Sequence, residues 1–200
     1  MYQKQKPKLK KKLRIGIDLD NTIIDYSNAF KKINYKFFDN NKKINKKKLK
    51  IKIEKIFKYK GWSKVQEIIF GKYITCCHPY SGFVNFYQKN LKKKNILYIV
   101  SHKTHLSEYS KKYPIRDEAK SWIFKNIKNI KKNKIFFERT LQNKVKRIKK
   151  LKLDIFIDDM YQVFTHEEFD KKCQKILFKD KKKNLKCFNS WNKIYEYINE

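Results

Sequence analysis

Five short apolar segments along this chain of 200 residues constrain its fold more than any other feature. Each is rich in Ile, Val, Phe, Leu or Tyr and is nearly continuous rather than alternating. The five segments are Leu13–Leu19, Ile96–Val100, Lys134–Phe137, Leu153–Ile157 and Ile176–Phe178. Continuous apolar runs of this kind are typical of strands buried on both faces of a parallel sheet. The sequence therefore predicts a five-stranded parallel sheet.

Helical patterns lie between and after the later segments. Apolar residues recur every three or four positions over Ile115–Ile130 and again over Leu141–Ile148. A closing helix is expected over Trp191–Ile198, with Asn189 or Ser190 as its N-cap. Strands that alternate with helices indicate βαβ units, so the fold class that the sequence predicts is α/β.

More than seventy residues between Leu19 and Ile96 contain no further buried strand. Apolar spacing there predicts three helices, around Phe30–Phe37, Leu49–Phe57 and Val65–Ile69. We therefore expect a helical insertion after the first strand. The predicted division of the chain is a flexible basic tail over 1–12, a core domain over 13–27 and 85–200, and a helical insertion over 28–84.

The chain is strongly basic, with 52 Lys and Arg against 19 Asp and Glu and a net charge of +33. Of the 52 cations, 48 are Lys and only four are Arg, although Arg is the residue favoured for bidentate contacts to phosphate and bases. Lys, Asn, Ile, Phe and Tyr share A/T-rich codons, so compositional drift over solvated faces is our preferred interpretation. A nucleic-acid surface, an anionic membrane or another acidic partner remain alternatives. The charge should draw anionic substrates inward and make binding salt-sensitive.

Composition excludes several classes of protein. Hydrophobic residues make up 40% and aromatic residues 16%, which excludes wholesale disorder. No run approaches the ~18 apolar residues of a membrane span. Cys76, Cys77, Cys173 and Cys187 form no CxxC pair, so we expect reduced thiols and no zinc site at Cys76-Cys77-His78. We predict a soluble, cytoplasmic protein and leave its oligomeric state open.

Acidic residues follow two of the predicted strands, Asp18 and Asp20 after the first and Asp158 and Asp159 after the fourth. Carboxylates at i and i+2 of an extended segment point the same way, so they repel each other and lose water together. In open α/β sheets, ligands bind outside the carboxyl ends of the strands, where the strand order reverses. If the two strands are neighbours there, the carboxylates converge and require a cation. Oxygen ligands without His or Cys favour Mg²⁺.

These residues carry a resemblance to a known family. Asp18-Leu19-Asp20-Asn21-Thr22 matches the DxDx[TV] signature of the haloacid dehalogenase (HAD) superfamily. Ser101, at the end of the second strand, is similar to the second motif of that family, and Asp158-Asp159 is similar to the fourth. For the third motif, a Lys ahead of the fourth strand, we choose Lys144, with Lys120 or Lys146 as alternatives.

The resemblance covers residues 13–180 and looks closest to a little-characterised bacterial branch of small HAD hydrolases. It implies a Rossmannoid three-layer sandwich with strand order 5-4-1-2-3, in which the first and fourth strands are neighbours. The insertion would be a small, mobile helical cap. Only about 57 residues separate Ser101 from Asp158, which leaves no room for a second cap.

The resemblance also implies a mechanism and a substrate class. Asp18 would attack phosphorus to form an aspartyl-phosphate, and Asp20 would act as general acid and then as general base. The implied ligands of Mg²⁺ are Asp18, Asp20 through its backbone carbonyl, Asp158 and, as a further candidate, Asp159. The implied phosphate-binding residues are Ser101, Lys144, Asn21 and Thr22. Asp at the second position of the signature favours a phosphatase over a dehalogenase.

The expected substrate is a small phosphorylated metabolite, such as a sugar phosphate or a nucleotide. One alternative is a phosphotransferase, which shares the same motifs. Another is a basic nucleic-acid-binding module that uses the HAD core only as a scaffold. His102, Lys103 and His105 follow Ser101, and either face the substrate or belong to an ordinary polar loop.

Overall fold

The computed structural model describes residues 12–58, 60–107 and 109–200. Its centre is a sheet of six parallel strands in the order β5-β4-β1-β6-β7-β8. The strands are β1 (Arg14–Ile17), β4 (Ile96–His102), β5 (Ile135–Glu138), β6 (Ile155–Asp158), β7 (Gln174–Phe178) and β8 (Lys186–Phe188). The five predicted strands and their predicted order are confirmed. The prediction of five strands is corrected to six, because β8 extends the sheet beyond β7.

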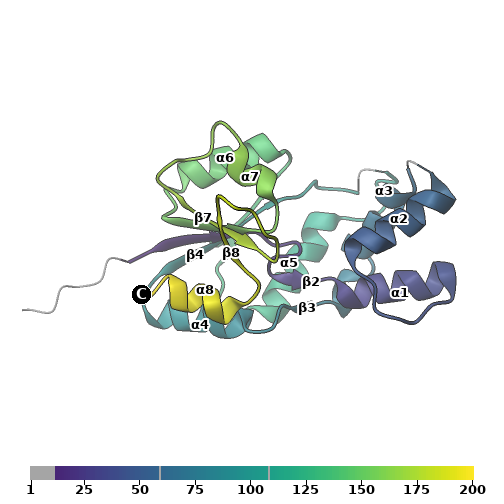
Figure 1. The fold of residues 1–200 in the computed structure, drawn as a ribbon, viewed down its shortest axis with the longest axis horizontal. Coiled ribbons are helices and arrows are strands. Elements are labelled where there is room, and N and C mark those ends of the chain that lie inside the picture. The colour runs from purple at the N-terminus through teal and green to yellow at the C-terminus, as the bar shows by residue number, and fades with distance from the viewer. Residues whose placement is uncertain (1–11, 59, 108) are drawn as a thin grey trace, which may run out of the picture.

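Helices cover both faces of the sheet and complete the predicted three-layer sandwich (Figure 1). One face packs against α4 (Phe83–Lys92), α5 (Ile115–Asn126) and α8 (Trp191–Tyr197). The other face packs against α6 (Leu141–Lys150) and α7 (Tyr161–Thr165). Helices α5, α6 and α8 occupy three of the predicted helical regions, and the N-cap of α8 is Ser190, whose hydroxyl accepts from the Asn192 N–H at 3.2 Å. Helices α4 and α7 were not predicted.

Side chains along β1 alternate between the two faces. Ile15 and Ile17 belong to the apolar cluster on the α5 side. Gly16 lies on the opposite face, where an added Cβ would come within 2.7 Å of Phe156 and 2.3 Å of Leu153. Only glycine leaves room for those side chains. Because β1 and β6 are parallel with Gly16 opposite Phe156, the residues two positions further along each strand reach the same end of the sheet on the α6 side.

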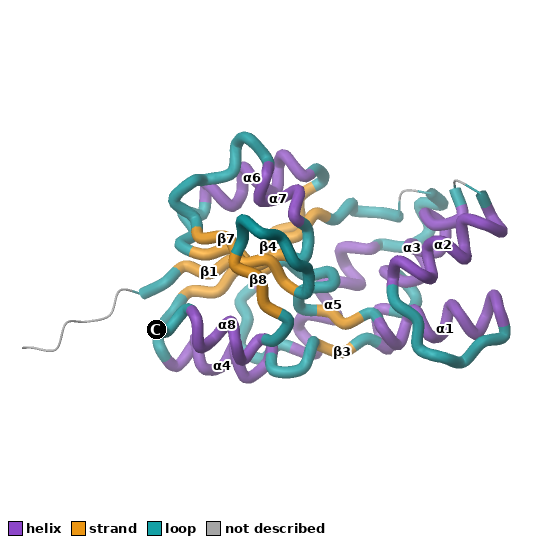
Figure 2. The backbone as a smooth tube through the Cα atoms, in the orientation of Figure 1, coloured by secondary structure: helices purple, strands orange, loops and turns teal. Residues whose placement is uncertain are grey.

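Three helices occupy the long insertion: α1 (Ser27–Phe38), α2 (Lys46–Phe57) and α3 (Gly61–Phe70). They match the three predicted helices, and together we call them the cap. The cap is joined to the core through β2 (Ile24–Asp25) and β3 (His78–Pro79), which pair antiparallel and lie between the sheet and the cap helices (Figure 2). The boundaries 28–84, 13–27 and 85–200 as separate domains stay predictions. The tail predicted over 1–12 lies outside the described residues, except for Lys12.

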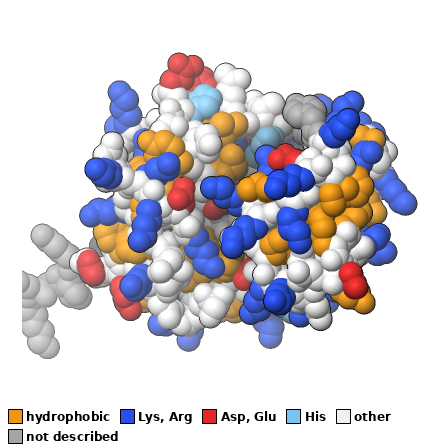
Figure 3. All heavy atoms as spheres, turned by 45° about the vertical axis from the view of Figure 1, so that its right-hand side comes forward, with side chains coloured by type: hydrophobic (Ala, Val, Ile, Leu, Met, Phe, Trp, Pro, Cys, Tyr) orange, Lys and Arg blue, Asp and Glu red, His pale blue; other side chains and the backbone are white. Residues whose placement is uncertain are grey.

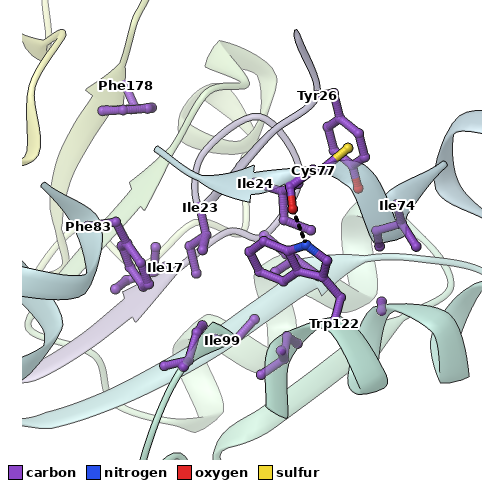
Figure 4. Packing of buried hydrophobic residues seen from close by; sticks show 14 of the residues in the cluster. Ile17, Ile23, Ile24, Tyr26, Ile74, Cys77, Phe83, Ile99, Trp122 and Phe178 are labelled. Atoms are coloured by element: carbon purple, nitrogen blue, oxygen red, sulfur yellow. Dashed lines mark hydrogen bonds between the residues drawn. The ribbon is translucent and has the colours of Figure 1, made fainter. Parts of the chain in front are cut away.

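The apolar interior is continuous from the core into the base of the cap (Figure 4). Ile23, Ile24 and Tyr26 are buried where the chain leaves the core. The Trp122 indole N–H on α5 donates to the Cys77 carbonyl at 2.9 Å, after a short 3₁₀ turn at Ile74–Cys76. The cap is therefore seated on the core by packing as well as by its two connecting segments.

All four cysteines are free thiols, as predicted. Among the described residues, none of the helices has the length and apolar character that crossing a membrane requires.

Candidate active site

The ends of β1 and β6 bring two of the predicted carboxylates to one lysine. Asp18 directly follows β1, and its N–H donates to the Ile157 carbonyl at 2.9 Å, so it stays in register with Asp158 at the end of β6. The Lys144 ammonium lies 2.5 Å from Asp18 Oδ1 and 2.6 Å from Asp158 Oδ2. All three residues are at most 4% exposed. The structure therefore joins three of the predicted site residues into one buried cluster.

Lys144 reaches the cluster because of how α6 begins and packs. The Thr140 hydroxyl caps the helix by accepting from the Asn143 N–H at 3.1 Å. Val145 and Ile148 are fully buried, which turns the Lys144 face of the helix toward the sheet.

The two alternative lysines lie elsewhere. Lys120 pairs with Asp117 and Lys146 with Glu168, and the side chains of both lysines are more than half exposed. Among the three lysines considered from the sequence, Lys144 is the one that contacts the carboxylates.

Burial and mutual repulsion disturb the ionisation of this cluster. Burial raises the pKa of Asp18 to about 7; Lys144 opposes this shift, whereas the charges of Asp158 and Asp20 add to it. Burial also raises the pKa of Asp159 well above its usual range, with Asp158 and Asp18 adding to the effect. Burial lowers the pKa of Lys144, but the charges of Asp158 and Asp18 outweigh it, so the net shift is upward. Lys144 is therefore a cation, and it neutralises only one of the three negative charges that the cluster would carry if Asp18, Asp158 and Asp159 were all ionised.

The donor set of this cluster fits a divalent cation. Asp18, Asp158 and Asp159 each offer one carboxylate oxygen, and these oxygens lie within 4.8 Å of one another. A group of hard oxygen donors with excess negative charge is the environment that Mg²⁺ prefers. The Asp20 carboxylate is not part of this group, so Asp20 can join it only through its backbone carbonyl, the atom implied from the sequence.

The Asp20 carboxylate has partners of its own. The Lys103 ammonium donates to its Oδ1 at 3.1 Å and forms an ion pair with its Oδ2 at 2.8 Å, and the Tyr26 hydroxyl donates to Oδ1 at 2.5 Å. Two carboxylates only two residues apart are therefore held by different lysines. Asp18 and Asp20 occupy distinct environments, as two different chemical roles require.

Three other residues were predicted to bind phosphate: Ser101, Asn21 and Thr22. Ser101 and Asn21 line the cavity that contains Asp18, whereas Thr22 does not. Ser101 is buried at the end of β4 and lines the same cavity as Asp18. Asn21 also lines it, in a left-handed backbone conformation with φ of 58°. Thr22 is fully buried and does not line the cavity; its hydroxyl accepts from the Asp159 N–H at 3.1 Å. Thr22 thus ties the β1 and β6 ends together, and its expected contact with phosphate stays a prediction.

A cavity of about 270 Å³ lies between the carboxyl ends of the strands and the cap. Its cap side is formed by Lys46, Ser63, Gln66, Glu67 and Phe70. Its core side is formed by Asp18, Asp20, Asn21, Ser101, His102, Lys103, Thr104, Ile115, Lys144, Asp159 and Met160. The cavity places Asp18 and Asp20 in one space, whose other walls are formed by neutral, apolar, cationic and acidic side chains.

Several residues of this cavity were missed or left undecided from the sequence. The sequence leaves Lys103 between two interpretations and does not single out Tyr26, Glu67 or Phe70. A signal for Lys103 exists, because it stands two positions after Ser101 on an extended segment and so shares its face. The other three depend on how the cap folds against the core, which no local pattern reports.

Comparison with known proteins bears on the fold. No family model matches the chain, and no curated protein matches it. A HAD hydrolase of family IA, variant 3, from Entamoeba histolytica superimposes with a TM-score of 0.57 at 12% identity, over 94% of this chain and 100% of the other. A hydrolase of the haloacid dehalogenase-like family from Streptococcus pneumoniae gives 0.56 at 14% identity, over 94% and 98%. The HAD-type protein YfnB from Bacillus subtilis, described as bound to magnesium, gives 0.52 at 16% identity, over 96% and 100%.

These neighbours cover nearly the whole chain at low identity, so the likeness is one of fold. The chain has the haloacid dehalogenase-like fold, and the resemblance drawn from its motifs is confirmed at that level.

Proposed function

We propose that this protein is a Mg²⁺-dependent phosphatase that hydrolyses a small phosphate monoester through an aspartyl-phosphate on Asp18. The observation that carries the proposal is that Asp18 and Asp20 open into one cavity while they hold different partners. A nucleophile must stay anionic, whereas an acid–base group must exchange a proton, and two separate environments serve these two needs. The neighbours of this fold, which carry the names of hydrolases and a predicted phosphatase, agree with this class of reaction.

In the first half of the proposed reaction, an Asp18 oxygen bonds to phosphorus and the bond to the leaving group breaks. The proton on Asp20 passes to the leaving oxygen. In the second half, Asp20 takes a proton from water as the water oxygen bonds to phosphorus, and the aspartyl-phosphate bond breaks to release phosphate. Splitting one difficult displacement into two easier ones is the advantage of a covalent intermediate.

The other residues of the cavity bind and orient the transferred group. Ser101 and Lys144 donate to phosphoryl oxygens in this proposal and balance their charge as it develops. Asp18, Asp158 and Asp159 would hold Mg²⁺, with the Asp20 carbonyl. When bound, this ion neutralises charge on the carboxylates and on a phosphoryl oxygen, so that two anions can approach.

The cap forms the wall of the cavity that, in this proposal, contacts the part of the substrate outside the reacting phosphate. Lys46 is the cap lysine that lines the cavity, and it suits a second anionic group on the substrate. A sugar phosphate or a nucleotide fits this description. The cytoplasmic location of the protein stays a prediction.

Transfer to an acceptor other than water uses the same residues, so product analysis with candidate acceptors separates a phosphotransferase from a phosphatase. The nucleic-acid alternative gains no support from the face in Figure 3, where Lys and Arg side chains are spread among neutral and apolar ones. Length-dependent binding at ~150 mM salt that survives Asp18→Asn would favour it.

The test is release of phosphate from a panel of phosphate monoesters that includes p-nitrophenyl phosphate. Activity should need Mg²⁺ and vanish with EDTA. Asp18→Asn should lower it by ~10⁴-fold or more, because the nucleophile is lost while the side-chain shape is kept. Asp39→Asn, at an exposed helix end with a left-handed backbone that Asn accepts, is the matched control and should retain activity. A folded, metal-loaded protein that cleaves no member of the panel would contradict the proposal.

A further inference from the structure

Lys103 is an unusual lysine in this chain. Of the lysines that the structure describes, only Lys103 and Lys144 are buried, with 4% and 1% of their surface exposed. A lysine is almost never buried without a partner, because its charge loses water. Both buried lysines pair with a carboxylate of the Asp18-Leu19-Asp20 segment. Lys144 is accounted for by the proposed mechanism, whereas Lys103 has no role in it.

The contacts of Lys103 fix the Asp20 carboxylate at both oxygens. The Lys103 ammonium donates to Oδ1 at 3.1 Å and forms an ion pair with Oδ2 at 2.8 Å, and the Tyr26 hydroxyl also donates to Oδ1, at 2.5 Å. Asp20 follows the end of β1, next to the left-handed Asn21, where the backbone alone does not hold a side chain. These donors therefore decide where the carboxylate points.

Besides Asp20, Lys103 contacts three other parts of the molecule. Its N–H donates to the Glu138 carbonyl at 2.8 Å, at the end of β5, and its carbonyl accepts from Arg116 Nε at 2.9 Å, on α5. Its ammonium lies 4.6 Å from the ring centre of Phe70, on cap helix α3, and that ring meets the Tyr26 ring edge-on at 5.3 Å. Asp20, Tyr26, Phe70 and Lys103 thus form one cluster at the junction of core and cap.

We propose that Lys103 is a positioning residue that holds the Asp20 carboxylate toward the leaving oxygen of the substrate, with support from Tyr26 and from Phe70 of the cap. This inference rests on the proposed phosphatase reaction. Lys103 acts through Asp20 and not as a phosphate ligand, because its ammonium contacts both oxygens of the Asp20 carboxylate and lies against the Phe70 ring. The proton that Asp20 delivers must reach one atom of the leaving group, so the direction of its carboxylate sets the rate of that transfer.

The test compares two esters of similar size that differ in their need for a proton. Phenyl phosphate releases a weakly acidic phenol, whereas p-nitrophenyl phosphate releases a phenolate that is stable without a proton. The ratio kcat/KM reports the reaction up to release of the phenol. Lys103→Met should lower kcat/KM about 10²-fold for phenyl phosphate and less than ~10-fold for p-nitrophenyl phosphate. Binding of inorganic phosphate should change by less than ~2-fold, since no phosphate ligand is lost.

Two further variants keep the test sound. Lys112→Met, at an exposed lysine of the same loop, is the matched control and should change neither ester. Tyr26→Phe removes only the hydroxyl that donates to Asp20 and should lower the phenyl phosphate rate several-fold in the same direction. A thermal melt of each variant checks that it folds.

A crystal structure of the Lys103→Met variant supplies a readout that does not depend on activity. The Asp20 carboxylate should leave its position beside Tyr26 or split between two rotamers. Equal losses on both esters, a loss confined to KM and phosphate binding, or an unmoved Asp20 would each overturn the inference. A wild-type protein that cleaves neither ester would instead count against the proposed function, and the position of Asp20 would still decide the inference.

Discussion

The two buried lysines stand in different surroundings. Lys144 comes from α6 and bridges Asp18 and Asp158, so every partner in that cluster belongs to the sheet or to a helix packed on it. Lys103 comes from the segment after β4 and pairs with Asp20, but its ammonium lies against a ring supplied by the cap. The Lys144 cluster is therefore built within the core alone, whereas the Lys103 cluster, which holds the proposed acid–base residue Asp20, is completed by the cap.

This difference suggests how the cap takes part in the reaction. The cavity of the proposed active site lies between the cap and the core, so access to it depends on the position of the cap. If the cap moves, the Lys144 cluster keeps its partners while the Lys103 cluster loses Phe70. We infer that changes in the cap alter proton transfer and leave the metal site intact, and that changes in α6 act on stability and metal binding.

Removing Lys144 should have the largest effect. Lys144→Met leaves the Asp18 and Asp158 carboxylates buried without their cation, and the free energy of unfolding should fall by about 3–5 kcal/mol at neutral pH without Mg²⁺. Lys146→Met is the matched control on the same helix. Its ion pair with Glu168 is exposed, so its effect should stay within ~0.5 kcal/mol. Urea unfolding measures the stability of both variants. Equal unfolding midpoints for the two variants would contradict the prediction that Lys144 stabilises the buried carboxylates.

The Lys144 centre was largely predictable from the sequence, and the physical reason is local. Asp18 and Asp158 stand at the ends of continuous apolar runs, so the strand positions fix where they point once the strands are neighbours. Lys144 follows from the helix that precedes β6, although the sequence alone does not separate it from Lys120 and Lys146, which the structure shows to be exposed.

The Lys103 centre was not predictable in the same way. With 48 lysines in the chain, a lysine near any site carries little information. Its partners Tyr26 and Phe70 stand at either end of the cap helices and meet only when the cap has folded. Tertiary contacts between distant segments leave no periodicity in the sequence.

The parts of the fold that were missed are short or atypical. Strands β2 and β3 have two residues each, too few for any period, and β8 has three with no fully buried side chain. Helix α4 buries Phe83, Phe86 and Tyr87 at helical spacing, but its fourth buried residue is Asn90. Asn90 is satisfied by the Phe86 carbonyl and by Asn95, and a buried asparagine breaks the apolar pattern on which the prediction depended.

A change of pH should have an effect of intermediate size on Mg²⁺ binding. This effect should depend on the Lys144 cluster and not on the Lys103 cluster. Burial raises the pKa of Asp18 to about 7, and Mg²⁺ needs the ionised carboxylate, so protons compete with the metal below that pH. The dissociation constant for Mg²⁺ should therefore fall by about 5-fold from pH 6 to pH 7 and by ~10-fold from pH 6 to pH 8, and level off above pH 8. Isothermal titration calorimetry in two buffers measures this and the protons released. An affinity that is constant from pH 6 to pH 8 would show that Asp18 is already ionised or does not bind the metal.

The smallest effect is expected from the contact that fastens the cap beside Lys103. Glu67 on α3 is 6% exposed and accepts from the Ser110 N–H at 2.6 Å and from the Ser110 hydroxyl at 2.7 Å. Glu67→Gln keeps the shape but removes the charge, which should weaken this contact by about 1 kcal/mol and speed hydrogen exchange at the Ser110 amide. Because Phe70 lies one turn further along α3, kcat/KM for phenyl phosphate should fall a few-fold while Mg²⁺ affinity stays the same. Glu54→Gln, on the exposed side of α2, is the control. If Glu67→Gln weakens Mg²⁺ binding instead, the two centres are not independent, and the division between core and cap is wrong.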